Sequence, residues 1–348
     1  MSKVINFVYR LLEFLRMDFT KYLSLATLSY GVTLLSGFDL SATIKNNSFT
    51  LTSDTSYLTN IIGILLIIFS LAIGISKIIE ASKKPSIMFY LYGLKNMGKN
   101  APVYAMSKID RLHALKNEFN AMGSYSKETV KKEYEYYQWS IENRINHNNI
   151  DKIYLCGLAS IPMLFLFGTL FRNAHSEHEI QLVESFRYKT KGWKTLDIND
   201  ENNITIEHIL DDIENTTKDK EITRLINSKC NEVGIALSYT ASINKNAIPD
   251  NLINETLYLK TSLGIRHEVV SSKEAQTKLI QELVQIFTKF FDSGKTKIHL
   301  FISAQSTFVI NLGISYQDNM HGTLVIYNYD NNKNYNWCVE YKKGEIID

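Results

Sequence analysis

The sequence has little cysteine and little proline. Its 348 residues include only four prolines and three cysteines, Cys156, Cys230 and Cys338. Cysteines so far apart give neither a disulfide framework nor a CxxC metal site, which favours a reducing compartment. The formal net charge is only +2, so the chain has no global basic field for duplex nucleic acid.

Motifs for catalysis and for metal binding are also missing. There is no GxGxxG, and the GKT at residues 294–296 has Lys289 where a phosphate loop requires glycine. The HSEHE at residues 175–179 lacks the HExxH spacing of a helical zinc site. No nucleophile stands at a motif spacing from a base. The sequence therefore makes no positive case for an enzyme, and we expect neither a metal nor a cofactor.

Long hydrophobic runs are the first positive feature. Two runs near the N-terminus contain 17 and 22 uncharged residues. A helix that crosses a bilayer needs about 20 apolar residues. We therefore expect transmembrane helices at about residues 20–38 and 57–79, in a membrane part that covers residues 1–80.

The charges around these runs predict their topology. Four cations precede the first run and three follow the second, whereas the loop between them holds only Lys45. Cytoplasmic flanks carry the excess of lysine and arginine. We expect two passes through the bacterial inner membrane with both termini in the cytoplasm. Ahead of the first run, apolar residues at helical spacing predict a helix at about residues 3–17, which either lies among the lipid headgroups or extends the first span.

A third run, YLCGLASIPMLFLFGTLF at residues 154–171, is also long enough to cross a bilayer. We interpret it instead as part of a folded core, because it recurs. The segment that begins at Lys152 aligns without gaps with the segment that begins at Lys297. Identical residues coincide at Lys152/Lys297, Ile153/Ile298, Leu155/Leu300, Ala159/Ala304 and Gly168/Gly313. The second copy carries Gln305, Thr307 and Asn311 where a span would be apolar. A third crossing would also place the cations that follow it outside.

Both copies predict a buried strand, a turn of small residues and a helix. KIYLC is a short continuous apolar run, typical of a parallel strand that is buried on both faces. Ser160 suits an N-cap, and Pro162 suits the first helical turn. Helices between such strands predict an α/β fold with two Rossmann-like units, at about residues 151–242 and 243–348. Residues 81–150 are expected to form a helical connector.

The two strand-to-helix turns are the candidate site, since ligands of open parallel sheets bind beyond the carboxyl ends of the strands. The candidate residues are Gly157, Ala159 and Ser160 in the first turn, and Ser303, Ala304, Gln305, Ser306 and Thr307 in the second. Small residues let backbone N–H groups approach a ligand, and a helix N-terminus favours anions such as phosphate. For Gly157 and Ala159, tight packing under the helix explains the residue type equally well.

Aromatic residues follow the turns in both units. Tyr327 and Tyr329 lie at the end of the LVIYNYD strand, where they suit either stacking on a nucleobase or packing in the core. Phe186 and Arg187 are their counterparts in the first unit. Arg187 is a candidate partner for a phosphate group.

These segments resemble those of a known family. The two turns, the LVIYNYD strand and the helix SSKEAQTKLIQELVQIF together resemble SAVED domains, over about residues 151–348. The resemblance implies two CARF-like Rossmannoid units fused in pseudo-symmetry. With two transmembrane helices ahead of it, the chain is similar to the transmembrane SAVED effectors of bacterial CBASS anti-phage systems.

What the resemblance implies is a receptor. It would bind a cyclic di- or trinucleotide that a CD-NTase makes, form homo-oligomers, and disrupt the lipid bilayer of the inner membrane in abortive infection. Three alternatives stay open. They are a type III CRISPR-associated membrane effector that senses cyclic oligoadenylate, a membrane-anchored nucleotide-processing enzyme, and a structural anchor that recruits a partner.

Overall fold

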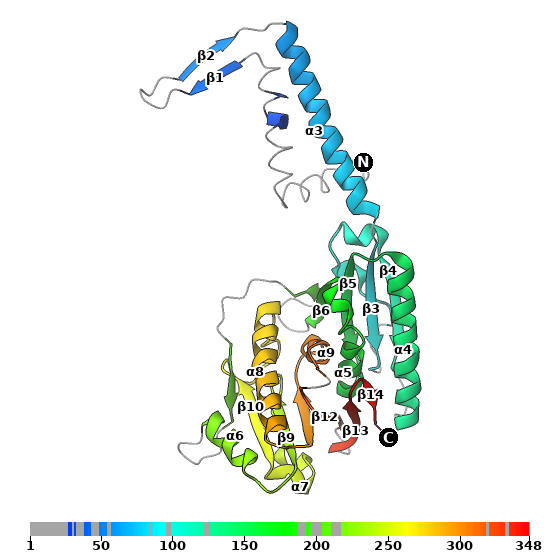
Figure 1. Ribbon diagram of the computed structural model, residues 1–348, viewed down its shortest axis with the longest axis vertical. Coiled ribbons are helices and arrows are strands. Elements are labelled where there is room, and N and C mark those ends of the chain that lie inside the picture. Colours follow the sequence, from blue (N-terminus) through cyan, green and yellow to red (C-terminus); the bar gives the residue numbers. More distant parts are fainter. Residues whose placement is uncertain are drawn as a thin grey trace. The chain divides into compact units, whose positions relative to one another are not determined.

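The chain divides into two compact units, Met1–Lys84 and Pro85–Asp348 (Figure 1). The computed structural model describes residues 27–29, 31–32, 38–42, 49–53, 57–83, 85–94, 99–121, 126–186, 192–196, 204–209, 217–317, 320–330 and 334–347. The expected headgroup helix at about residues 3–17 lies outside these ranges, as does most of the first expected span, at about residues 20–38.

The N-terminal unit contains an antiparallel hairpin and a long helix. Strands β1 (Phe38–Ala42) and β2 (Phe49–Ser53) form the hairpin, and helix α3 runs over Tyr57–Lys83. Eight large apolar side chains of α3 are between 42% and 59% exposed: Ile61, Ile62, Ile64, Leu65, Ile68, Phe69, Leu71 and Ile75. Judged by length and apolarity together, none of the helices in the described part of the chain qualifies as a membrane span.

The first sheet of the second unit has five strands in the order β4-β3-β5-β6-β7. Its strands are β3 (Ser86–Tyr92), β4 (Leu115–Asn120), β5 (Lys152–Leu158), β6 (Glu179–Phe186) and β7 (Gly192–Thr195). The first four run parallel to one another, and β7 pairs antiparallel with β6. The short helices η1 (Val103–Ala105), η2 (Asp110–His113) and η3 (Ala174–Ser176) connect these strands.

The expected helical connector at residues 81–150 is wrong in its first half. Its segment SIMFYLY forms β3, which pairs along its whole length with β5, and β4 pairs with the other edge of β3. The apolar run of β3 follows α3 so closely that periodicity alone does not separate the two. Only α4 (Lys127–Asn148) is a long helix, and the Ser126 side chain caps it by accepting a hydrogen bond from Thr129 N.

The third hydrophobic run forms strand, turn and helix, as predicted. Strand β5 leads through Ala159 and Ser160 into α5 (Ile161–Thr169), with Ser160 at the N-cap position and Pro162 in the first turn. Every residue of α5 from Pro162 to Thr169 is buried. The run is apolar because it fills the core of a mixed α/β fold.

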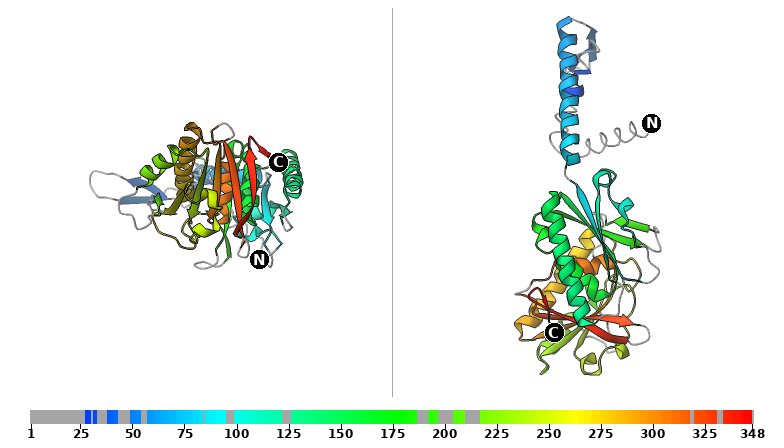
Figure 2. Two further views of the ribbon diagram at one scale, coloured as in Figure 1. Left: turned by 90° about the horizontal axis from the view of Figure 1, so that it is seen from below. Right: turned by 90° about the vertical axis from the view of Figure 1, so that its right-hand side faces the viewer.

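The second sheet has seven strands in the order β14-β13-β12-β11-β9-β10-β8. Its strands are β8 (Ile206–His208), β9 (Glu232–Ser238), β10 (Thr256–Thr261), β11 (Lys297–Ser303), β12 (Thr323–Asp330), β13 (Asn334–Lys342) and β14 (Glu345–Ile346). The central strands β10, β9, β11 and β12 are parallel, and the outer ones are antiparallel. Both views of Figure 2 show β12 and β13, in orange to red, side by side near the edge of this sheet that β14 forms.

The expected boundary near residue 242 is also wrong. Strand β9, predicted to end the first unit, pairs with β11 and β10 in the middle of the second sheet. The helices associated with this sheet are α6 (Lys218–Ile226), α7 (Asp250–Ile253), α8 (Lys273–Asp292) and α9 (Ser306–Ile314), with the short helix η4 (Lys245–Ala247). The chain therefore enters the second sheet before residue 209, earlier than the repeat suggested.

Helices α5 and α9 join the two sheets in one core, which also includes side chains of α4 and α8 (Figure 1). The two helices touch at Gly168 and Gly313, the glycines that coincide in the sequence repeat. A Cβ atom on Gly168 would overlap the carbonyl oxygen of Ile310, and one on Gly313 would overlap that of Phe165. Smaller separate cores cover the outer face of each sheet.

Candidate functional site

The carboxyl ends of the two sheets meet beside α9. Glu184, near the end of β6, accepts hydrogen bonds from Thr307 N at 3.0 Å and from Thr307 Oγ1 at 2.6 Å. Thr307 lies in the first turn of α9, directly after β11. Gly157, at the end of β5, also lies near α9, since a Cβ on it would stand 3.5 Å from Ile310 Cδ1. The carboxyl ends of strands from both sheets are thus brought together beside α9.

Ser303 ends β11 and holds the loop that follows β9. Its carbonyl oxygen accepts hydrogen bonds from Tyr239 N and Thr240 N, both at 2.9 Å. Its Oγ accepts one from Ala241 N at 3.1 Å and lies 3.1 Å from Thr240 Oγ1. Ser303 and Thr240 are both partly exposed, so this pair presents hydroxyl groups at the strand ends.

Gln305 stands at the N-cap position of α9 and is 8% exposed. Its Oε1 accepts a hydrogen bond from Val270 N at 2.9 Å, which ties the loop after β10 to this turn. Its Nε2 has no hydrogen-bond partner within the described part of the chain. The neighbouring Ala304 and Ser306 are partly exposed. The turn therefore presents Ser306 at the surface, whereas the amide nitrogen of Gln305 is buried.

Thr307 has a different role from the one that the sequence suggested. It is fully buried, and Gln276 Nε2 donates to its Oγ1 at 2.8 Å while that hydroxyl donates to Glu184. Glu184 also accepts a hydrogen bond from the backbone N–H of Thr307, in the first turn of α9. A ligand reaches Thr307 only if this network opens.

The first turn is dominated by packing. A Cβ on Gly157 would meet Leu164 Cδ2 at 2.8 Å, and Ala159 is 7% exposed. Glycine and alanine are therefore explained by the close approach of α5 to the sheet. Ser160 does not cap α5 with its side chain, and its buried Oγ has no partner among the residues that the structure describes.

The two tyrosines lie on the outer face of the second sheet. The ring of Tyr327 stacks on Phe301 with centroids 4.6 Å apart, and its hydroxyl lies 3.1 Å from His299 Nδ1. The ring of Tyr329 is 47% exposed and packs beside Tyr335. Alternate residues of a strand face opposite sides, so both rings point away from the face that carries α9.

The counterparts of these tyrosines at the end of β6, in the first sheet, are placed differently. Phe186 is 9% exposed and belongs to the core between the sheets. Arg187 lies outside the described residues.

Arg266 was not predicted, yet it lies at the same strand ends. It is exposed, and its N–H donates to Tyr239 O at 3.0 Å, so the loop after β10 folds over the end of β9. Among the described residues its guanidinium forms no ion pair. A lone arginine in GIRHE gives no sequence signal. We refer to Thr240, Arg266, Ser303, Gln305 and Ser306 as the strand-end surface.

A cavity of about 450 Å³ lies elsewhere, between β6, α8 and α9. Arg172, Lys273, Asn311 and Gln317 are among the residues that line it, and no residue of the strand-end surface or of the predicted site does. Within the described ranges, no group of His, Cys, Asp and Glu side chains is arranged to hold a metal ion.

Comparison with known proteins identifies the family. The family model described as "SMODS-associated and fused to various effectors sensor domain", SAVED, matches residues 135–340, which is more than half of the chain. The chain belongs to the SAVED family. The predicted resemblance to SAVED domains is thereby confirmed, and the match begins within α4.

Several solved structures are similar to this SAVED protein. The Acinetobacter baumannii Cap4 SAVED/CARF-domain containing receptor with the cyclic trinucleotide 3'3'3'-cAAA has a TM-score of 0.49 and 12% identity, covering 83% of this chain and 61% of that one. The same receptor with 2'3'3'-cAAA has a TM-score of 0.49 and 11% identity, with 83% and 60% covered. The Moraxella osloensis Cap4 receptor has a TM-score of 0.43 and 12% identity, with 90% and 61% covered.

The chain spans about 60% of the length of these receptors. Among curated proteins, the comparison finds no match.

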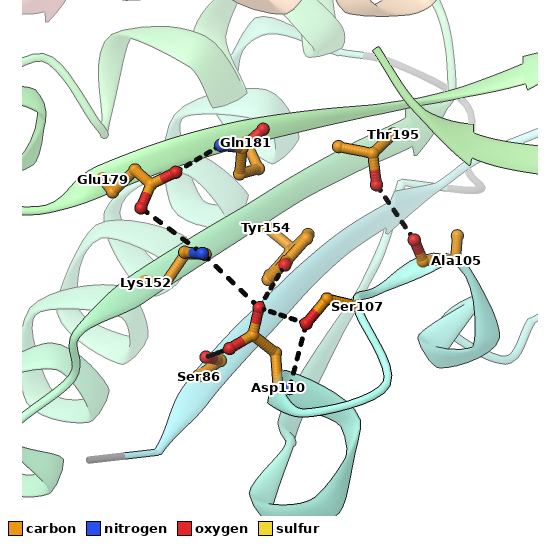
Figure 3. Close-up of polar contacts among 9 residues, drawn as sticks. All are labelled: Ser86, Ala105, Ser107, Asp110, Lys152, Tyr154, Glu179, Gln181 and Thr195. Carbon is orange, nitrogen blue, oxygen red and sulfur yellow. Dashed lines mark hydrogen bonds and ion pairs between the residues drawn. The ribbon is translucent and has the colours of Figure 1, made fainter. Parts of the chain in front are cut away.

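A polar cluster lies at the opposite, amino ends of β3 and β5 of the SAVED protein (Figure 3). The carboxylate of Asp110 accepts hydrogen bonds from Ser86 Oγ at 3.1 Å, Ser107 Oγ at 2.8 Å and Tyr154 OH at 2.5 Å. Lys152 Nζ lies 3.5 Å from the same carboxylate. Ser86 begins β3, so the cluster fixes the point at which the chain enters the first sheet.

The charges in this cluster are held in their ordinary states. Burial alone would raise the pKa of Asp110, but the hydrogen bond from Tyr154 and the charge of Lys152 outweigh it and lower the pKa. Burial would lower the pKa of Lys152, but Asp110 and Glu179 outweigh it and raise the pKa. Burial and the hydrogen bond to Asp110 raise the pKa of Tyr154. None of these shifts brings a pKa nearer to neutral pH, and the contacts of Asp110 join η2 to β3 and β5.

We expect Asp110→Asn to lower the free energy of unfolding by about 1–3 kcal/mol near neutral pH, because buried donors lose a charged acceptor. The pKa of Asp110 is lower in the folded state, so its carboxylate stabilises the fold above its unfolded-state pKa. That contribution is lost as the pH falls through the folded-state pKa, so the two proteins should converge in acid. Urea unfolding at about pH 7 and at a series of pH values below the ordinary aspartate pKa of about 3.9 measures this.

Glu128→Gln is the control for this substitution. It breaks an exposed pair between Glu128 and Lys132, which is worth no more than about 0.5 kcal/mol. Equal stability of wild type and Asp110→Asn near neutral pH would show that the cluster contributes nothing to the fold.

Proposed function

We propose that this SAVED protein is a receptor for a cyclic oligonucleotide, which binds at the strand-end surface. The observation that carries the proposal is that Thr240, Arg266, Ser303, Gln305 and Ser306 converge beyond the carboxyl ends of β9, β10 and β11. Ligands of open parallel sheets bind at such an edge. The family is described as a sensor domain, and the A. baumannii Cap4 receptor of the same family is known with cyclic trinucleotides.

Each of these groups suits a part of such a ligand. The guanidinium of Arg266 can form paired hydrogen bonds with a phosphate. The hydroxyl groups of Ser303 and Thr240 both donate and accept, so they suit phosphate oxygens and base edges. A ring with several phosphates could engage them together.

The proposal extends to the N-terminal unit. Residues 1–84 would act as the effector in the bacterial inner membrane, with two passes, both termini in the cytoplasm, and a role in anti-phage defence. The exposed aliphatic side chains of α3 support this, because a large exposed apolar surface marks a contact with membrane or protein. Ligand-linked self-association would gather these units, and a shift from about 1% to 99% assembled requires about 5.5 kcal/mol of preference for the assembled state.

Dye release from vesicles that carry the full chain, on addition of ligand, tests the proposed effector role of residues 1–84. The absence of release would contradict that role.

Arg266→Gln is expected to weaken binding of a cyclic trinucleotide at least about tenfold, because the ligand loses a hydrogen-bonding partner of opposite charge. The measurement is a calorimetric titration of the full-length protein with cyclic di- and trinucleotides, followed by recovery of the ligand. Arg144→Gln is the matched control, since it removes the same charge from the exposed C-terminal part of α4.

The outcomes separate the possibilities. Equal binding by wild type and Arg266→Gln would place the site elsewhere. Failure of every cyclic nucleotide to bind wild type would remove the receptor proposal, and cleaved ligand would indicate an enzyme.

A further inference from the structure

The cavity between β6, α8 and α9 belongs neither to the strand-end surface nor to the polar cluster around Asp110. Its volume is about 450 Å³, within the range of about 300–1,000 Å³ that is usual for small-molecule sites. Apolar side chains of β6 and α8 provide walls: Ile180, Leu182, Ile280 and Val284. A few polar groups stand among them, and this mixture is typical of a site that holds an organic ligand.

The charged residues that line this cavity are both cations. They are Arg172, which follows α5, and Lys273, the first residue of α8. In the part of the chain that the structure describes, no aspartate or glutamate is among the lining residues. Charges of one sign between walls of low dielectric concentrate the electric field, so the cavity attracts anions.

The ammonium group of Lys273 has capacity for another partner. Its Nζ donates to the carbonyl oxygen of Ile180 at 3.4 Å, and it forms no ion pair with any described residue. An ammonium group has three donors, and 3.4 Å is long for a hydrogen bond from nitrogen to oxygen. Two donors and the positive charge therefore remain for an anion.

The position of Lys273 in α8 also favours a role in binding. A cation in the first turn of a helix is unfavourable, because the helix dipole places positive partial charge there. The Ser272 side chain already caps this helix by accepting a hydrogen bond from Ala275 N. The one polar contact that the lysine side chain makes is the long bond to Ile180. Residues that break a local rule without an evident structural gain are expected at functional sites.

Asn311 of α9 supplies an oriented acceptor. Its Nδ2 donates to Gln276 Oε1 at 3.4 Å. Gln276 is 0% exposed and is held in turn by its own hydrogen bond to Thr307 Oγ1 at 2.8 Å. The Oδ1 of Asn311, a partly exposed residue that lines the cavity, is thereby left to accept from a ligand. The amino group of a base or the hydroxyl of a ribose suits such an acceptor.

We propose that this cavity is a second ligand site, for an organic phosphate of the size of a mononucleotide. The phosphate pairs with Lys273, the base and sugar lie against the apolar walls, and Asn311 accepts a hydrogen bond from them. A volume in the lower part of the usual range suits one nucleotide rather than a ring of several. The inference does not rest on the proposed function, because the cavity shares no residue with the strand-end surface.

Adenosine monophosphate is the probe, titrated calorimetrically into the full-length protein. We expect Lys273→Gln to weaken its binding about tenfold, because the phosphate loses a charged donor. The difference should shrink at high salt, since mobile ions screen charges. Adenosine and inorganic phosphate should each bind more weakly than adenosine monophosphate, because each lacks one half of the ligand.

The stability of Lys273→Gln separates binding from a structural role. The substitution removes a cation from the positive end of α8, so we expect urea unfolding to show no loss of stability. Lys278→Gln is the matched control for affinity, because it removes the same charge from an exposed position of α8 that does not line the cavity. It should leave the affinity for adenosine monophosphate unchanged.

Val284→Phe is an independent test that depends on volume and not on charge. Val284 is partly exposed and lies in an apolar wall, so a larger ring there fills part of the cavity. We expect binding of adenosine monophosphate to weaken at least about tenfold. Binding of a cyclic trinucleotide at the strand-end surface should not change in this variant or in Lys273→Gln.

Three results would overturn the inference. The first is binding of adenosine monophosphate to wild type weaker than about 1 mM. The second is unchanged affinity in both Lys273→Gln and Val284→Phe. The third is an equal loss in Arg266→Gln and Lys273→Gln, which would place adenosine monophosphate on the strand-end surface. The receptor proposal is decided separately, by the titration with cyclic di- and trinucleotides.

Discussion

A fragment that begins at Asp151 is expected to lose its cooperative fold and all ligand binding, whereas one that begins at Pro85 retains both. Strand β3 lies between β4 and β5 and pairs with β5 from Ser86↔Lys152 to Tyr92↔Leu158. Its side chains at Ile87, Phe89 and Leu91 are 0% exposed. Deletion of one such side chain costs about 2–5 kcal/mol, so the loss of the whole strand exceeds the total stability of a typical domain, about 5–15 kcal/mol.

The measurement is denaturant unfolding of both fragments, followed by titration with a cyclic trinucleotide. The fragment Pro85–Asp348 matches the second compact unit and is the positive control. A cooperative transition in the Asp151 fragment would show that β3 and β4 are dispensable, and that the repeat seen in the sequence is the true folding unit.

This expectation marks the limit of what the repeat could predict. The turns around Ser160 and Gln305 were placed correctly, because a continuous apolar run followed by small residues and a helix is a local pattern. The partners of a strand are not local. Strand β9 joins β11, more than 60 residues further on, and nothing in EVGIALS indicates which sheet it enters.

The candidate site was predictable in part for the same reason. Ser303 and Gln305 follow from the position of a strand end, and both lie on the strand-end surface. The position of Glu184 at this site does not follow from the sequence, because one glutamate in a strand gives no signal and its partner Thr307 lies 123 positions away. The tyrosines of LVIYNYD were ambiguous, because a nearly continuous apolar run does not show which alternate residues face the helices.

Gly168→Ala is expected to reduce the free energy of unfolding of the second unit by at least about 3 kcal/mol, at the upper end of the overpacking range. The new methyl group would overlap the carbonyl oxygen of Ile310 and would lie 3.1 Å from the Cα of Gly313. Both neighbours are backbone of α9, so no rotamer change can relieve the contact. In a free helix the same substitution stabilises by about 1 kcal/mol, so a net loss would show that helix packing decides the outcome.

Gly313→Ala tests the same contact from the other helix, since its methyl group would overlap the carbonyl oxygen of Phe165. Gly264→Ala is the control: the glycine has φ +82°, but no atom lies within 4 Å of the added Cβ. It should therefore show only backbone strain, about 1 kcal/mol. Urea unfolding of the three variants separates the two effects. If the α5 and α9 variants lose no more than Gly264→Ala, the helices can move apart freely, and the close α5–α9 contact is not what holds the two sheets together. If they lose much more, the separation of these two helices is fixed by the glycines, and the strand ends that flank them are held in one arrangement before any ligand arrives.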